Sequence, residues 1–99
     1  MTKEFTLHAG TVSLIKELLS LGGWANEIVD IYNAGKLIEV LPEPGSRNTE
    51  DLKKPVTIQL TSKQFETICK TVKFHVSKGV ILPTVYATQL IEQFELFKE

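Results

Sequence analysis

Cysteine and histidine are scarce in this sequence, which holds one cysteine, Cys69, and two histidines, His8 and His75. A single cysteine cannot form a disulfide within the chain, and these three residues are too few for the four ligands of a structural zinc site. On one helix Cys69 and His75 would point about 120° apart, because successive residues turn by about 100°. We therefore expect Cys69 to be a small core residue and His8 a surface or capping group.

Strong charge and long apolar runs are also lacking. The formal net charge is -1, which gives no overall attraction to nucleic acid or to an anionic membrane. No apolar run approaches the roughly 20 residues that cross a bilayer, and no apolar signal-peptide segment follows Met1. We expect a cytoplasmic protein that does not bind membranes, and the unpaired cysteine agrees with a reducing compartment.

Catalytic motifs are missing as well. No serine lies in a GxSxG context, and no glycine-rich stretch matches a phosphate loop. The acidic pairs Glu27 with Asp30 and Glu92 with Glu95 are three residues apart on predicted helices, where such pairs are usually solvated. The sequence therefore predicts a protein that is not an enzyme and that uses neither a cofactor nor a metal ion.

The clearest structural pattern runs from Val56 to Gly79. Residues 56–60 alternate apolar and polar side chains, which predicts a half-buried strand. Thr61 and Gln64 then match a capping box, in which each side chain satisfies a backbone amide of the other residue. Helical spacing continues up to Gly79, which we expect to end this helix because glycine adopts the left-handed conformation without steric cost.

The first half of the chain predicts a strand over residues 3–8 and a helix that starts at the N-cap Thr11. A second helix is expected over 24–34, ending at Gly35. Its apolar stripe would be Ala25, Ile28, Val29 and Tyr32. Residues 37–41, rich in β-branched side chains, predict a strand.

Residues 42–54 contain two prolines and a glycine in a polar run, which predicts a flexible loop. After Gly79, a last helix is expected from Pro83 to about Phe97. The predicted order is β-α-α-β-β-α-α. We expect one α+β domain over 1–99, with two layers, about three strands in an antiparallel or mixed sheet, and four helices.

Exclusion of these other classes leaves protein binding as the leading function. We expect a non-enzymatic protein that binds and blocks or bridges another protein, and that could also be a homo-oligomer. In size and in lacking a site it is similar to small bacterial or phage accessory and inhibitor proteins. Because tryptophan and tyrosine are frequent at interface hot spots, the expected contact residues are Trp24, Tyr32, Arg47, Leu96 and Phe97. Trp24 fits a core position equally well.

Two alternatives stay open. The first is a winged-helix-like nucleic-acid-binding regulator, with residues 24–34 as recognition helix and 42–54 as wing. Its basic residues would be Arg47, Lys53, Lys54, Lys63, Lys70 and Lys73. Against it, the supposed recognition helix carries two acidic residues and no basic residue, whereas lysine and arginine supply much of the affinity for phosphates. The second alternative is an oligomer that sequesters a small ligand.

Overall fold

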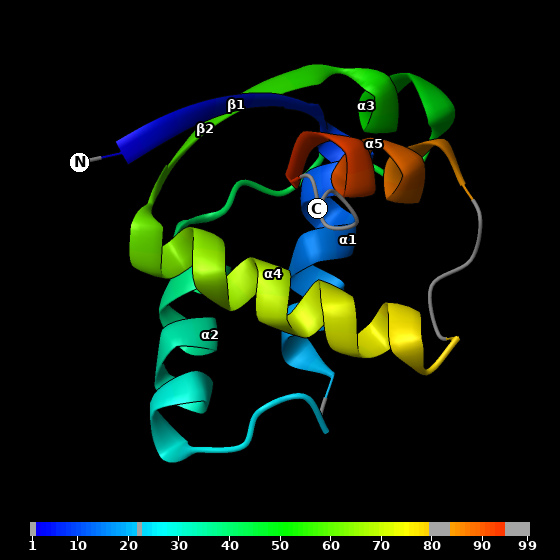
Figure 1. Ribbon diagram of the computed structural model, residues 1–99. Helices are drawn as coiled ribbons and strands as arrows, with labels where there is room; N and C mark the ends of the chain where they lie inside the picture. The colour runs from blue at the N-terminus through cyan, green and yellow to red at the C-terminus, as the bar shows by residue number, and fades with distance from the viewer. Residues whose placement is uncertain (1, 22, 80–83, 95–99) are drawn as a thin grey trace.

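The computed structural model describes residues 2–21, 23–79 and 84–94, which fold into one α+β domain (Figure 1). Within these residues there are two strands and five helices, not the three strands and four helices that the sequence predicts. Their bounds are β1 Thr2–His8, α1 Ala9–Ser20, α2 Ile28–Val40, α3 Thr49–Lys53, β2 Pro55–Thr61, α4 Ser62–Ser77 and α5 Val85–Phe94. Figure 1 shows α4 lying across α1, while α3 and α5 lie near the junction of β1 with α1.

The sheet consists of β1 and β2 paired antiparallel, with Phe5 opposite Ile58 and Leu7 opposite Val56. The alternation seen in the sequence is present in both strands. Phe5, Leu7 and Ile58 are buried against the helices, whereas the other face is polar. The two predicted strands 3–8 and 56–60 are therefore confirmed, each with one or two additional residues.

The hydrophobic core gathers around α1, whose Val12 and Ile15 are fully buried. A stack of three phenylalanine rings joins the sheet to two helices. The ring centroid of Phe94 lies 4.8 Å from that of Phe5 and 5.1 Å from that of Phe65. Such stacked pairs add to the free energy of burying the rings.

The long helix α4 begins with the predicted capping box. The backbone amide of Gln64 donates to Thr61 Oγ1 at 3.2 Å, and the backbone amide of Thr61 donates to Gln64 Oε1 at 2.9 Å. At the other end, Gly79 has a φ of 69°, which is the left-handed conformation expected of a glycine that terminates a helix. Local signals alone thus placed this helix correctly.

The helix α1 begins at Ala9, not at the predicted N-cap Thr11. The strand β1 ends at His8 and passes directly into this helix, and the amide of Ala9 donates to the carbonyl of Lys54 at 2.8 Å. Thr11 is fully buried and its hydroxyl donates to Gln89 Oε1 at 2.6 Å. The hydroxyl that looked like a cap instead connects α1 to α5.

The predicted strand over 37–41 is wrong, because α2 continues through this segment to Val40. Leu37 is fully buried one turn beyond Ala34, so helical packing against the core outweighs the strand preference of the β-branched residues. Gly35 does not end the helix. It lies within α2, where a methyl group in place of its hydrogen would extend into open space.

The predicted loop over 42–54 contains the short helix α3, which the sequence did not predict. Asn48 caps this helix, since its Oδ1 accepts the amide of Asp51 at 2.9 Å. The last helix, α5, runs from Val85 to Phe94. Its predicted start at Pro83 and its extension to Phe97 lie outside the described residues.

Candidate interaction surface on α2

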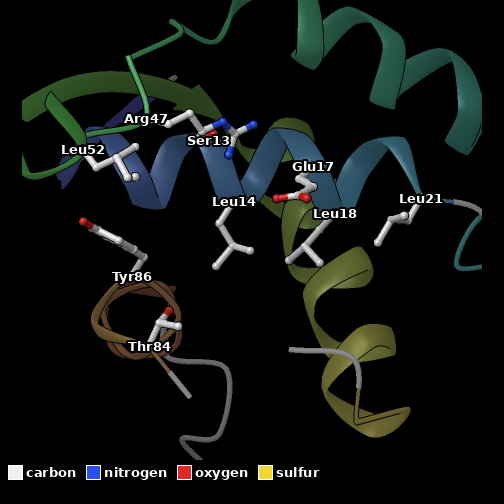
Figure 2. Close-up of a pocket in the computed structure, with 10 residues that line it drawn as sticks. Ser13, Leu14, Glu17, Leu18, Leu21, Arg47, Leu52, Thr84 and Tyr86 are labelled. Atoms are coloured by element: carbon white, nitrogen blue, oxygen red, sulfur yellow. The ribbon is translucent and has the colours of Figure 1, made fainter. Parts of the chain in front are cut away.

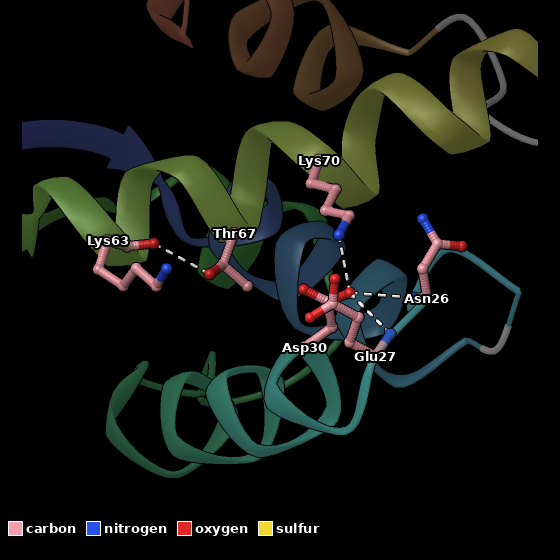
Figure 3. A network of polar contacts seen from close by, with 6 residues as sticks. All are labelled: Asn26, Glu27, Asp30, Lys63, Thr67 and Lys70. Atoms are coloured by element: carbon pink, nitrogen blue, oxygen red, sulfur yellow. Dashed lines mark hydrogen bonds and ion pairs between the residues drawn. The ribbon is translucent and has the colours of Figure 1, made fainter.

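The inward face of α2 is narrow. Ala34 and Leu37 are its buried residues, and Leu41 just beyond the helix is buried as well. One ion pair ties the start of the helix to α4, with Lys70 Nζ 2.7 Å from Asp30 Oδ2 (Figure 3). These contacts determine which side of α2 faces the core.

Asp30 also organises the first turn of α2 (Figure 3). Its Oδ2 accepts the backbone amides of Asn26 at 3.0 Å and of Glu27 at 3.2 Å. The hydrogen bond from Lys70, followed by these backbone hydrogen bonds, lowers the pKa of Asp30 below its ordinary value despite some desolvation. The carboxylate therefore stays charged and keeps both the cap and the ion pair.

The outward face of α2 is apolar. Ile28 is 86% exposed, Ile31 65% and Tyr32 62%. The predicted core-facing stripe of Ile28, Val29 and Tyr32 is wrong, since all three side chains are exposed. The term α2 surface denotes Ile28, Ile31, Tyr32, Gly35 and Lys36.

Two hollows are lined in part by residues of the α2 surface. The smaller, of about 230 Å³, lies over Gly35 between Tyr32 and Glu39. The larger, of about 380 Å³, separates α2 from the end of α1, and its wall includes Leu21 and Ile31. Because glycine has no side chain, the helix backbone at Gly35 can be approached closely.

One cation borders this apolar area. Lys36 Nζ lies 5.6 Å from the centroid of the Tyr32 ring, a cation–π distance. Among the described residues, Lys36 and the exposed Glu39 form none of the salt bridges. Both charges can therefore be matched by groups on a binding partner.

Three of the five predicted contact residues lie in the described part of the chain, and they do not come together. Tyr32 lies on the α2 surface, whereas Trp24 is buried, with 2% of its surface exposed. Arg47 is exposed and lines a hollow beside α1, apart from α2 (Figure 2). Leu96 and Phe97 lie outside the described residues.

Ile28, Ile31 and Gly35 were not predicted as surface residues. The available signal was an excess of apolar residues, since the predicted helix over 24–34 carries Ile31 outside its predicted stripe. A helix with apolar residues on several sides has more than one possible inward face. The sequence could therefore indicate that this helix has more apolar faces than the core can bury, but not which face is exposed.

The residues of the winged-helix alternative are also dispersed. Lys53 and Lys54 lie at the end of α3, whereas Lys63, Lys70 and Lys73 lie along α4. Lys54 and Lys70 pair with carboxylates of this chain. The strand that would precede the wing is part of α2, so the arrangement that suggested this fold is absent from the described residues.

Other types of site find no support in the same residues. No three His, Cys, Asp or Glu side chains in the described ranges are grouped in a way that could hold a metal ion. In the part of the chain that the structure describes, none of the helices is both long enough and apolar enough to span a bilayer. Comparison with known proteins finds no match to a family model, to a curated protein or to a solved structure.

Proposed function

We propose that this protein is a non-enzymatic binding module that docks an amphipathic helix of another protein on the α2 surface. The observation that carries the proposal is the exposure of Ile28, Ile31 and Tyr32 together on one face of one helix. Isolated exposed apolar residues are common, but a contiguous apolar area bordered by polar residues is typical of interaction sites.

The shape of the surface favours a helix as the partner segment. The hollow over Gly35 and the larger hollow toward the end of α1 are neighbours, since Ile31 and Gly35 line both of them. An amphipathic helix presents large apolar side chains at intervals of three or four residues, which suits two neighbouring hollows. Binding would then bury the exposed apolar groups and occupy the partner, blocking it or bridging it to another molecule.

The charges specify the partner further. Lys36 lies beside Tyr32 on the α2 surface, and we expect an acidic residue of the partner helix to pair with it. Charge complementarity of this kind sets the orientation of a docked helix more than its affinity. The expected partner helix therefore has apolar anchors and a carboxylate that reaches Lys36.

Photo-crosslinking to identify the partner, followed by binding measurements with the purified partner, tests the proposal. A photoreactive phenylalanine analogue at Ile28 should crosslink to the partner, whereas the same analogue at Thr88, exposed on α5, should not. The purified partner should bind the wild-type protein at least tenfold more tightly than the I28S/Y32S variant, because truncated hot-spot residues cost about 2 kcal/mol or more.

The controls separate binding from folding. Since both side chains are exposed, I28S/Y32S should retain the wild-type denaturation midpoint. K36E should weaken binding, and reversal of the partner's acidic residue should restore it. An adduct made of two copies of this chain, or equal binding of the wild type and I28S/Y32S, would contradict the proposal.

A further inference from the structure

A separate hollow of about 310 Å³ lies between α1, α3 and the start of α5 (Figure 2). This volume is at the lower end of the range for small-molecule sites. Its apolar wall comes from two helices and the residue after α1. The leucines concerned are Leu14, Leu18, Leu21 and Leu52.

Charges of both signs border this hollow. Figure 2 shows Arg47 reaching toward the α1 side, where Ser13 and Glu17 also lie. Among the described residues, the side chains of Arg47 and Glu17 take part in none of the salt bridges or side-chain hydrogen bonds. An exposed guanidinium and an exposed carboxylate therefore border one apolar hollow without pairing with each other.

The walls of the hollow are held by contacts that do not use these two charges. Arg47 lies in a turn closed by Ser46, whose hydroxyl donates to Asp51 Oδ2 at 2.7 Å. On the opposite wall the ring of Tyr86 lies so close to Gly10 that an added Cβ would be 2.6 Å from a ring carbon. The turn and the tyrosine are thus positioned before any ligand binds.

We infer that this hollow binds a free apolar amino acid, such as leucine, through both of its charges. Arg47 and Glu17 border the same hollow, and Figure 2 shows both side chains beside α1. The ammonium and carboxylate of an amino acid are attached to the same carbon, so the ligand can place one against Glu17 and the other against Arg47. Its side chain then contacts the leucines of the wall.

The pairing of charges distinguishes this ligand from related compounds. A fatty acid could pair with Arg47, but it would leave Glu17 without a cation and close to a second anion. An amine could pair with Glu17, but it would leave Arg47 without an anion and close to a second cation. A residue within a peptide carries neither charge, and a terminal residue carries one. A hollow with one free group of each sign therefore favours the zwitterion.

Isothermal titration calorimetry with three ligands tests this inference. L-Leucine should bind saturably, whereas N-acetyl-L-leucine and L-leucinamide, each lacking one charge, should bind at least about tenfold more weakly. Amide chemical shifts should change at Leu14, Leu52 and Tyr86. Absence of saturable leucine binding, equal binding of all three ligands, or shift changes confined to α2 would overturn the inference.

Two variants assign the charges individually. R47Q should lower the affinity for leucine about tenfold without changing that for leucinamide, while E17Q should lower it for leucine without changing it for N-acetyl-leucine. The control E50Q alters an exposed acid outside the hollow and should bind leucine like the wild type. Wild-type affinity for leucine in both R47Q and E17Q would exclude the proposed site.

Discussion

The indole Nε1 of Trp24 lies 3.3 Å from the carbonyl oxygen of Leu19. That carbonyl belongs to the last turn of α1, where no residue of the same helix can donate to it. The neighbouring carbonyl of Leu18 is satisfied in a similar way by the hydroxyl of Thr71 at 3.0 Å. Trp24 and Thr71 thus close the end of α1, one from the chain that follows it and one from α4.

The Trp24 contact predicts a large loss of stability on truncation. W24A should lower the free energy of unfolding by about 3–5 kcal/mol, because it removes a buried aromatic side chain. W24F should cost less, since it retains most of the packing and loses mainly the hydrogen bond, worth about 0.5–1.5 kcal/mol. Urea denaturation followed by circular dichroism measures both losses. Tryptophan fluorescence cannot be used, because Trp24 is the only tryptophan and both variants lack it. Near-wild-type stability of W24A would contradict its place in the core.

Replacing Gly35 or Gly10 by alanine should change the stability in opposite directions. G35A should raise the free energy of unfolding by about 0.5–1 kcal/mol, because alanine is the better helix former and the space around Gly35 is open. G10A should lower it by about 1–3 kcal/mol, since the new methyl group overlaps the Tyr86 ring. Thermal and urea denaturation of both variants provide the measurement.

The G10A effect should depend on Tyr86. In a Y86A background the ring is gone, and G10A should cost little, giving a coupling of about 0.5–3 kcal/mol between the two positions. Additive losses in the double variant would show that the tyrosine ring does not cause the destabilisation.

The ion pair of Asp30 predicts acid sensitivity. Its pKa is lowered in the folded state, so the stability it contributes is present above the unfolded value of about 3.9 and is lost as the pH falls through the folded pKa. D30N should flatten the profile of stability against pH below about pH 4. D30A should destabilise more than K70M at pH 7, since it also removes the acceptor for two backbone amides.

Asp51 provides the comparison for this measurement. Hydrogen bonds from Ser46 and then from Lys54 lower the pKa of Asp51. D51N should therefore also flatten the profile of stability against pH in the acid range, independently of D30N. Urea midpoints measured from pH 7 down to pH 3 would resolve the two contributions. A pH profile that is unchanged in D30N, in D51N and in the D30N/D51N double variant would exclude both carboxylates as its source.

The single thiol predicts slow chemical modification. Cys69 is half-buried, and burial raises its pKa above the ordinary value, although Lys73 partly opposes the shift. Because the thiolate is the reactive form, alkylation by iodoacetamide at pH 7.5 should be slower in the folded protein than in urea. The alkylation rate should begin to rise at a higher pH in the folded protein than in the unfolded chain.

The same pKa shift links Cys69 to stability. Since the pKa of Cys69 is raised in the folded state, the stability linked to the neutral thiol is lost as the pH rises through the folded pKa.

Local sequence patterns are sufficient to predict the two strands and α4. Alternation of apolar and polar residues identified residues 3–8 and 56–60, and the Thr61–Gln64 pair located the start of the helix. These signals are local, because each depends only on residues that are neighbours along the chain or within one turn of it.

Contacts between distant segments set the orientation and the length of α2. Apolar residues occur on several sides of this segment, so periodicity does not select one inward face. Packing at Leu37 and the ion pair between Asp30 and Lys70 select it, which exposes Ile28 and Tyr32. The same packing converts the predicted strand into helix and leaves Trp24 to cap α1, because contacts between distant segments outweigh local preference.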